Sequence, residues 1–494
     1  MKISDFFAHH GINRNPFAEE DAQSDIVFQS GCINTARHPG WDKIFGDPDL
    51  PSTSVVFGEK GSGKTALRIQ MTRALDQYNQ AHPQGKVFII QYNDFNPFLD
   101  GFQERFSGMW KKPESFLKRW KLWDHIDAIL SLGVTQLTDQ VLQIRDSSGN
   151  IPPELNLQKL DENQRRDLLL LAALYDQSSS GGQFSRWKQL KRKLGVFSLA
   201  IWKWLSVAAA WFLLFLGIAI GTWHLEWHNG GMLWRIEFWL FLLVGTIPLA
   251  YRQLWAKWKA WVLWRNLRSR RFEKDPLKKI LLNFTPGQLA NQPLPTSARS
   301  DDRYALLGKF SELIQILGYK GMVILVDRVD EPYLINGAAP LMRDLIWPLL
   351  DNKLLKYPNI GFKLLLPAEL YDFVSREGNE FRERSRLDKQ NMIPSLNWTG
   401  ASLYDMVNSR LAACSDASYT QKEPETLEQL FDSSMSREHL TDSLERIRTP
   451  RRVFKFLYEL LVEHSNSHTE QNPQWQISTN EFDNTLKHFL KNEL

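Results

Sequence analysis

The sequence predicts an α/β fold, in which a parallel β-sheet receives an inserted pair of apolar helices and is followed by a C-terminal helical region. Three observations support this prediction. Short apolar runs rich in β-branched residues alternate with helical patterns, which is typical of a parallel sheet covered by helices. Two longer apolar segments near the middle of the chain carry almost no charge. Residues 395–494 show helical periodicity.

The composition is that of a folded protein, with 43% hydrophobic and 23% charged residues in a chain of 494 residues. The net charge of +4 is near neutral for this length, so it neither supports nor excludes a nucleic-acid partner. The two cysteines, Cys32 and Cys414, are too few for a disulfide framework and suit a reducing compartment. Residues 1–17 lack a continuous apolar segment, so we expect no secretory signal peptide.

The order of the patterns predicts five regions along the chain. Buried strands are expected at residues 54–57, 86–92, 322–326 and 360–366. The expected regions are a polar lead-in (1–50), the first half of the sheet domain with a helical extension (51–180), an apolar hairpin with a basic interfacial helix (186–275), the second half of the sheet domain (300–394) and a C-terminal helical domain or lid (395–494).

Two apolar segments predict a transmembrane hairpin. Residues 205–223 form a run of about 19 residues without charge, close to the roughly 20 that a helix needs to cross the hydrocarbon core. Residues 238–251 form a shorter run flanked by tryptophans, as is typical of membrane interfaces. Because basic residues flank both outer ends, the positive-inside rule predicts a multi-pass protein of the inner or cell membrane with both globular parts in the cytoplasm. The alternative is a tryptophan-rich pair of core helices. The helical face expected to lie on the anionic inner leaflet consists of Tyr251, Trp255, Trp258 and Val262.

Residues 58–65 match the phosphate-binding motif G-x-x-x-x-G-K-[ST] in full, between a predicted strand and a predicted helix. Glycines in such a loop let backbone N–H groups point at phosphate oxygens, and the helix N-terminus adds its positive dipole. We expect Lys64 to bridge the β- and γ-phosphates and the Thr65 hydroxyl to bind Mg²⁺. The alternative is a glycine-rich turn with a surface lysine. The motif therefore predicts a P-loop nucleoside triphosphatase, whose nucleotide-binding residues are Gly58, Glu59, Lys60, Gly61, Ser62, Gly63, Lys64 and Thr65.

The second half of such a site is an acidic residue at the end of a buried strand, and Asp327 follows the apolar run 322–326. We expect Asp327 to hold Mg²⁺ through water. Glu331, or else Asp330, is positioned to orient or deprotonate the attacking water, and we favour Glu331. The alternatives are a strand-terminal turn for Asp327 and helix capping for the pair that follows.

The stretch VILVDRVDE over residues 323–331 resembles the strand ending of the signal-transducing (STAND) P-loop ATPases, a group with AAA+-like domains. The placement of apolar helices between the two motifs resembles the KAP family of that group. This resemblance implies ATP and Mg²⁺ as ligands and a switch used in signalling or in defence against phage. Two features depart from the pattern: Arg328 replaces a glycine or aspartate, and residues 367–369 replace a polar or arginine sensor. ATP is favoured also because the guanine signature [NT]-K-x-D is not visible in the sequence.

A transition-state arginine is also expected. Arg451 and Arg452 open a C-terminal helical pattern and are candidates for a sensor borne on the lid. A second group of arginines fits a solvated charged face as well as a catalytic role. This group consists of Arg376, Arg382, Arg384 and Arg386.

Together these features favour a membrane-anchored ATPase that acts as a nucleotide-dependent switch. Nucleotide binding would close the C-terminal helices over the phosphate loop, homo-oligomers would form, and hydrolysis would reset the state. A protein partner or effector would receive the signal. One alternative is a nucleic-acid-stimulated motor, favoured by the basic stretch 264–279. The other is a membrane scaffold that binds nucleotide with little turnover.

Overall fold

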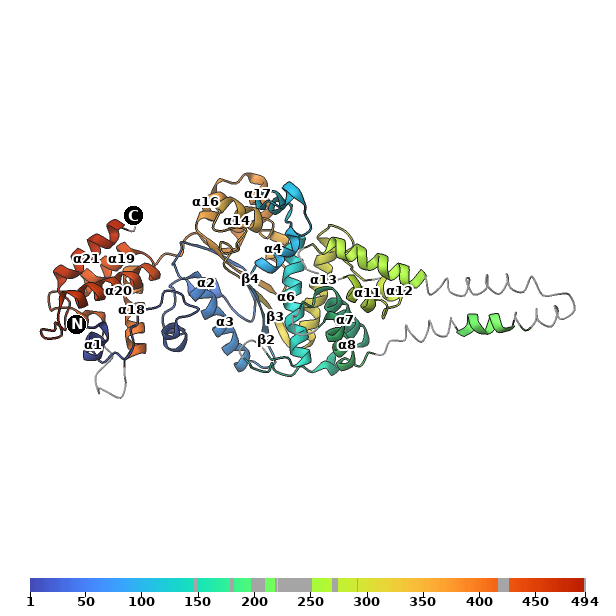
Figure 1. Ribbon diagram of the computed structural model, residues 1–494, viewed down its shortest axis with the longest axis horizontal. Helices are drawn as coiled ribbons and strands as arrows, with labels where there is room; N and C mark the ends of the chain where they lie inside the picture. The colour runs from blue at the N-terminus through green and yellow to red at the C-terminus, as the bar shows by residue number, and fades with distance from the viewer. Residues whose placement is uncertain are drawn as a thin grey trace. The chain divides into compact units, whose positions relative to one another are not determined.

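The computed structural model describes residues 1–145, 149–177, 182–196, 209–217, 220, 251–268, 274–290, 292–415 and 426–492. These residues divide into two compact units. The first unit combines both ends of the chain, Met1–Phe95 and Gly318–Leu494, and the second unit is the intervening segment Asn96–Leu317 (Figure 1). The first unit therefore contains both predicted motifs.

A five-stranded parallel sheet lies within the first unit, with the strand order β2-β3-β4-β1-β5. Every residue of β1 and β4 is buried, which explains why these strands read as continuous apolar runs. Strands are observed at all four positions where the sequence predicts them, and the short β5 was not predicted. Their bounds are β1 Ser54–Gly58, β2 Lys86–Tyr92, β3 Tyr319–Val326, β4 Ile360–Pro367 and β5 Asn391–Ile393.

The helix that follows β1 packs against the sheet through one apolar face. Leu67, Met71 and Leu75, spaced by four residues, join a core cluster with Val56 and Leu365 of the strands. This packing fixes the first turn of α3 beside the ends of the strands. The helices of the unit are α1 (Ile3–His9), α2 (Trp41–Phe45), α3 (Lys64–Ala81), α14 (Ala339–Ile346), α15 (Asn352–Leu355), α16 (Glu369–Arg376), α17 (Asn379–Ser385), α18 (Gly400–Cys414), α19 (Arg437–Ile447), α20 (Pro450–Ser467) and α21 (Thr479–Asn492), with shorter helical turns at Phe28–Cys32, Leu387–Lys389 and Leu427–Leu430.

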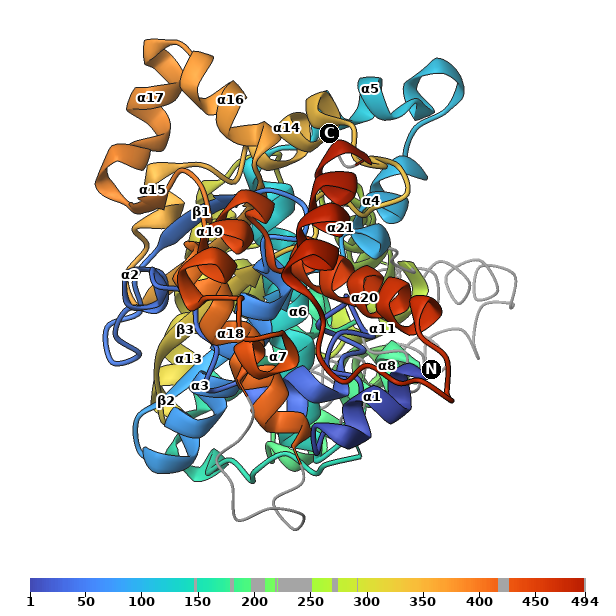
Figure 2. The ribbon, with the colours of Figure 1, turned by 90° about the vertical axis from the view of Figure 1, so that its left-hand side faces the viewer.

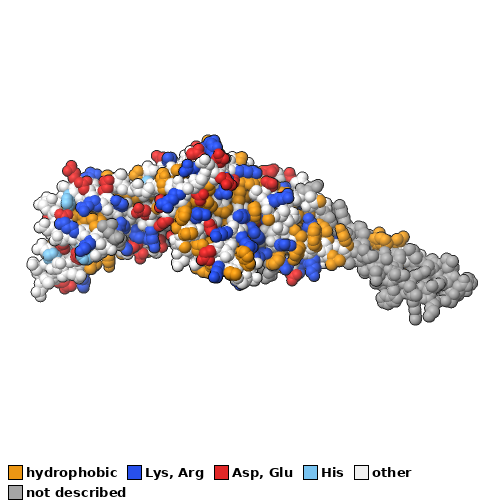
Figure 3. All heavy atoms as spheres, turned by 90° about the horizontal axis from the view of Figure 1, so that it is seen from above, with side chains coloured by type: hydrophobic (Ala, Val, Ile, Leu, Met, Phe, Trp, Pro, Cys, Tyr) orange, Lys and Arg blue, Asp and Glu red, His pale blue; other side chains and the backbone are white. Residues whose placement is uncertain are grey.

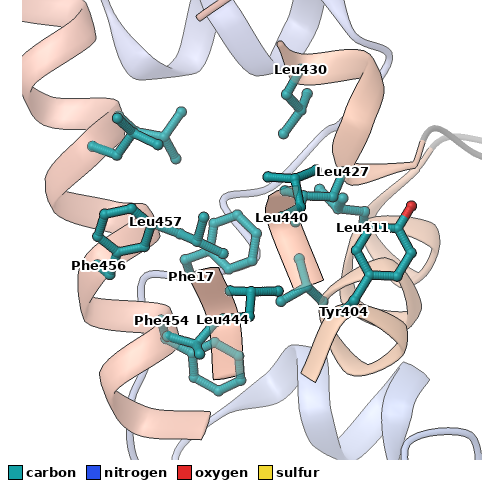
Figure 4. Close-up of a cluster of buried hydrophobic side chains, with 14 of the residues drawn as sticks. Phe17, Tyr404, Leu411, Leu427, Leu430, Leu440, Leu444, Phe454, Phe456 and Leu457 are labelled. Atoms are coloured by element: carbon teal, nitrogen blue, oxygen red, sulfur yellow. The ribbon is translucent and has the colours of Figure 1, made fainter. Parts of the chain in front are cut away.

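Helices α18–α21 enclose a second core in the same unit, and α1 packs beside α20 (Figures 1 and 2). Figure 4 shows part of this core, in which Phe17 from the N-terminal segment meets Leu457 of α20 and Leu444 of α19. Phe6 and Phe28 are buried in the same cluster. The first residues of the chain are thus part of the C-terminal helical core.

The second unit consists of helices in the described residues. Its long helix α6 packs against α7, α8 and α13. Buried arginine–aspartate pairs join these helices, among them Arg303 with Asp127. The helices are α4 (Asn96–Gln103), α5 (Pro113–Phe116), α6 (Leu122–Leu142), α7 (Glu162–Tyr175), α8 (Gln183–Lys193), α11 (Lys274–Leu281), α12 (Pro286–Ala290) and α13 (Asp301–Ile316), with 3-10 turns at Gly108–Lys111, Leu117–Arg119 and Leu157–Lys159 and further helical residues at 209–217 and 251–266.

The predicted transmembrane hairpin requires a correction. Among the described residues, no helix combines the length and the apolar character needed to cross a bilayer. This finding contradicts the hairpin in the predicted fold class and the predicted multi-pass membrane location. Most of the two predicted spans, 205–223 and 238–251, lies outside the described residues. In the helix at 251–266, Ala256, Ala260 and Leu263 are buried in the protein, whereas Tyr251 and Trp258 are exposed.

Candidate functional site

The loop between β1 and α3 has the backbone conformation that the phosphate-binding motif requires. Gly61 and Gly63 have φ angles of +84° and +95°, in the left-handed region that favours glycine. A Cβ on Gly61 would also lie 2.8 Å from the Cβ of Arg451. Helix α3 begins at Lys64 without a side-chain cap, so the N–H groups of its first turn have no partner within the helix and face a ligand position.

Lys64 is held against the inside of this loop. Its ammonium donates hydrogen bonds to the carbonyl oxygens of Gly58 at 2.7 Å and Glu59 at 3.0 Å. Burial lowers the pKa of Lys64, and the carboxylates of Asp330, Asp327 and Glu369 oppose this shift. The lysine therefore stands among acidic groups at the loop, where a polyphosphate would compete for its hydrogen bonds.

The structure brings Thr65 and Asp327 together from the two predicted motifs. Asp327 directly follows β3 and is 1% exposed, and the Thr65 hydroxyl donates to its Oδ2 at 3.2 Å. Arg68, one turn further along α3, donates from Nε to the same oxygen at 3.1 Å. Arg68 also donates to Gln91 at 2.8 Å. A hydroxyl and a carboxylate are hard oxygen donors, so this pair fits Mg²⁺.

Asp330 and Glu331 lie on the turn after β3, and both line the same cavity as Lys64. Arg328 starts this turn with a φ angle of +61° and forms an ion pair with Glu331 at 3.2 Å. Burial raises the pKa of Glu331, and the charges of Asp330 and Asp327 add to the shift while Arg328 opposes it. A carboxylate with a raised pKa next to the phosphate position suits a general base.

Segments from along the whole first unit line a cavity of about 420 Å³ in front of the loop. This volume is in the range of small-molecule sites. Phe28, Met406 and Phe454 supply apolar wall, and the N-terminal segment adds Asp25, which pairs with Arg410 at 2.6 Å. Residues 1–50, predicted as a lead-in, thus contribute directly to the site.

The C-terminal helices contact the phosphate loop through its backbone. The indole N–H of Trp398, just before α18, donates to the carbonyl oxygen of Ser62 at 2.8 Å. The backbone N–H of Arg451, in the first turn of α20, donates to the carbonyl oxygen of Gly61 at 3.3 Å. Arg451 lines the cavity, and its Nε lies 3.9 Å from a carboxylate oxygen of Glu20. Hydrogen bonds therefore join the phosphate loop to the residues at the start of α18 and α20.

His38 supports Trp398 from the N-terminal segment. Its Nδ1 accepts from the Gly40 N–H at 2.9 Å, and its Nε2 lies 2.8 Å from the carbonyl oxygen of Asn397. This arrangement is that of a neutral ring with the proton on Nε2, and burial lowers the pKa of His38 in agreement. The ring packs edge-on against Trp398 with centroids 5.1 Å apart.

The other predicted arginines have different surroundings. Among the described residues that line the cavity, the arginine-rich group near residue 380 is not represented. Arg382 donates to the Ser375 carbonyl and Arg384 to the Trp347 carbonyl, both at the surface. Arg451 is thus the member of the predicted arginines that lines the cavity, whereas Arg68, Arg410, His38 and Trp398 were missed by the sequence analysis.

Comparisons of the chain with protein-family models, with curated proteins and with solved structures find no match.

Proposed function

We propose that this chain is an Mg²⁺-dependent ATPase that works as a nucleotide-controlled switch. The observation that carries the proposal is the joint placement of Lys64, Thr65 and Asp327 around a glycine loop with free helix N–H groups. This constellation serves the binding of a triphosphate, and it is difficult to explain by packing alone. ATP is proposed because the guanine signature is not seen in the sequence.

Each residue has a defined role in the proposed reaction. The N–H groups of residues 61–65 hold the phosphate oxygens, and Lys64 exchanges its carbonyl partners for the β- and γ-phosphates. Thr65 and Asp327 would hold Mg²⁺, which neutralises charge on the phosphates when it is bound. Glu331, assisted by Asp330, orients or deprotonates the attacking water. The apolar wall of Phe28, Met406 and Phe454 would take the base.

The switch is proposed to act through the two backbone contacts from the C-terminal helices. Because Trp398 and Arg451 bind the carbonyl oxygens of the loop, a nucleotide that repositions the loop also repositions α18 and α20. Arg451 lines the cavity, and its guanidinium would sense the terminal phosphate. Homo-oligomers and a protein effector are the expected readouts, and a role in signalling or phage defence rests on the family resemblance alone.

The proposal is tested by ATP hydrolysis in the full chain. We expect Lys64→Ala and Glu331→Gln to lower turnover by roughly 10²–10³-fold, the size of effect seen when a charge-stabilising group is removed. Arg73→Ala, an exposed change on the same helix α3, is the matched control. Equal turnover in wild type and Lys64→Ala would reject the ATPase assignment.

The pH profile separates the roles of the two acids. Since the pKa of Glu331 is raised, the acid limb of turnover should lie above the usual range of a glutamate and should disappear in Glu331→Gln. An unchanged acid limb in that variant would transfer the role of base to Asp330.

A second candidate, a scaffold that binds nucleotide with little turnover, is favoured by one observation. Arg68 already neutralises Asp327, and both side chains are buried. A cation in this position competes with Mg²⁺ for the carboxylate. Tight nucleotide binding together with turnover that no variant lowers would support the scaffold.

A further inference from the structure

Two histidines and a glutamate meet at the junction of α20 and α21. His464 lies in the last turn of α20, His468 is its C-cap residue, and Glu481 lies in the first turn of α21. One potential ligand atom from each side chain lies within 4.8 Å of the other two. The described residues that line the nucleotide cavity do not include any of the three.

The contacts of His464 require a proton or a metal ion between its Nδ1 and the carboxylate of Glu481. The ring is 1% exposed, and its Nε2 lies 3.0 Å from the carbonyl oxygen of Gln474, so Nε2 carries the proton. Its Nδ1 then presents a lone pair to the carboxylate of Glu481, whose oxygens lie at 3.0 and 3.1 Å. Two acceptors at this distance repel each other unless a proton or a metal ion lies between them.

The neighbouring residue favours a metal ion. The ring of His468 lies 4.6 Å from that of His464, centroid to centroid, and adds a second imidazole donor to the same place. The Nε2–H of His464 on a backbone carbonyl is also the outer hydrogen bond that metal-binding histidines usually make. We propose that His464, His468 and Glu481 form a binding site for a divalent transition-metal ion, with Zn²⁺ as the ion that such nitrogen and oxygen donors suit best.

The three ligand atoms would have to move closer together to bind one ion. Zn²⁺ binds nitrogen and oxygen at about 2.0–2.2 Å, which places tetrahedral ligand atoms about 3.4 Å apart. The three atoms lie within 4.8 Å of one another, and His468 and Glu481 are partly exposed, so their side chains have room to rotate toward this spacing. Water would complete the coordination. The ion would join the end of α20 to the start of α21, on the helix whose first turn contacts the phosphate loop.

The experiment measures metal binding by the untagged full chain, without nucleotide, so that its result does not depend on the proposed ATPase activity. Protein stripped with a chelator is titrated with Zn²⁺ in competition with a chromophoric indicator, and then with Co²⁺, whose visible absorption reports its coordination. We expect about one ion per chain and a Co²⁺ absorption spectrum typical of tetrahedral coordination. His468→Gln should weaken binding at least tenfold.

The controls separate a built site from chance binding. His439→Gln removes a histidine that pairs with Asp483 at 2.8 Å in the same group of helices, and it should leave Zn²⁺ binding unchanged. Because His464→Gln changes a buried residue and risks misfolding, the partly exposed Glu481→Gln is the second test variant. Equal Zn²⁺ affinity in wild type and His468→Gln, or no uptake by wild type, would overturn the proposal and leave a protonated His464 paired with Glu481.

Discussion

Buried carboxylates occur in the second unit and at the nucleotide site of the first unit, and the way in which these two groups are paired differs. In the second unit, Arg186 meets both carboxylate oxygens of Asp176 at 2.9 and 3.0 Å, and Arg268 meets both oxygens of Asp124 at 2.7 and 3.3 Å. In the first unit, Thr65 and Arg68 both use Oδ2 of Asp327, and among the described residues no donor reaches its Oδ1. A carboxylate whose two oxygens both accept hydrogen bonds from arginine serves to join helices. A carboxylate beside a cavity that has one oxygen without a donor can bind a ligand through that oxygen.

Burial also shifts the pKa of a structural carboxylate in the second unit. Burial raises the pKa of Asp124 to about 6 although Arg268 opposes the shift, so this carboxyl depends on its arginine to stay ionised. Figure 3 shows basic and acidic side chains interspersed on the visible surface, which does not resemble the single-sign patch of a nucleic-acid footprint.

The largest expected effect comes from breaking a structural pair. Arg303→Met leaves Asp127 buried without its arginine, which should lower the free energy of unfolding by about 3–5 kcal/mol. Urea unfolding measures it. Lys309→Met on the same helix α13 removes a partly exposed pair with Asp167 and should cost about 1 kcal/mol or less. Similar losses in the two variants would show that burial does not determine the value of these pairs.

Arg68→Met tests the corresponding change at the nucleotide site. Without ligand, the buried Asp327 loses its arginine, and we expect a loss of up to about 3–5 kcal/mol. Unlike the loss in Arg303→Met, this one should be partly restored by Mg²⁺ and a non-hydrolysable ATP analogue, since the ion replaces the arginine. At a free ligand concentration of 100 Kd, binding adds about 2.7 kcal/mol.

Thermal unfolding with and without the Mg²⁺ complex gives the comparison. The ligand-induced shift should be larger in Arg68→Met than in wild type. If the Mg²⁺ complex stabilises both proteins equally, Arg68 does not compete with the ion. That result would disfavour the scaffold with little turnover.

Gly61→Ala tests the contact between the loop and α20. The φ angle of +84° costs an alanine roughly 1–2 kcal/mol, and its Cβ would lie 2.8 Å from the Cβ of Arg451. Gly318→Ala has the same kind of strain at φ +102° with open space around the Cβ. We expect both variants to lose stability in urea, and only Gly61→Ala to lose nucleotide affinity, as measured by calorimetry. Equal nucleotide affinities of Gly61→Ala and Gly318→Ala would show that the contact between the loop and α20 does not contribute to nucleotide binding.

The phosphate loop and the acidic strand end could be predicted because each is a contiguous stretch whose chemistry follows from local sequence. Trp398 and Ser62 are 336 positions apart, and Arg410 and Asp25 are 385 apart, so no local pattern reveals that they meet. The apolar pattern also misled. It predicted a transmembrane hairpin, whereas no helix among the described residues is long and apolar enough to cross a bilayer. An apolar run shows how much surface must be covered and not what covers it.

Two buried lysines of the first unit, Lys64 and Lys363, differ in whether carboxylates lie near them. Burial lowers the pKa of both, but Lys64 has carboxylates nearby. Among the described residues, the one hydrogen-bond acceptor of Lys363 on β4 is the Ile44 carbonyl at 2.8 Å, and the pKa of Lys363 falls to about 7. An unfolded lysine titrates near 10.5, so between pH 7 and 10.5 the unfolded chain binds more protons than the folded one. Stability should therefore rise with pH across this window, by up to about 1.4 kcal/mol per pH unit.

Lys363→Met removes the titrating group, so its unfolding free energy should lack this slope and should equal or exceed that of wild type at pH 7. The exposed Lys356→Met is the control and should keep the slope. Urea unfolding at several pH values between 7 and 10 measures all three proteins. A slope that persists in Lys363→Met would mean that this lysine stays charged in the fold. Burial alone would then not neutralise a lysine in this sheet, and the carboxylates around Lys64 would not be needed to explain why Lys64 is charged.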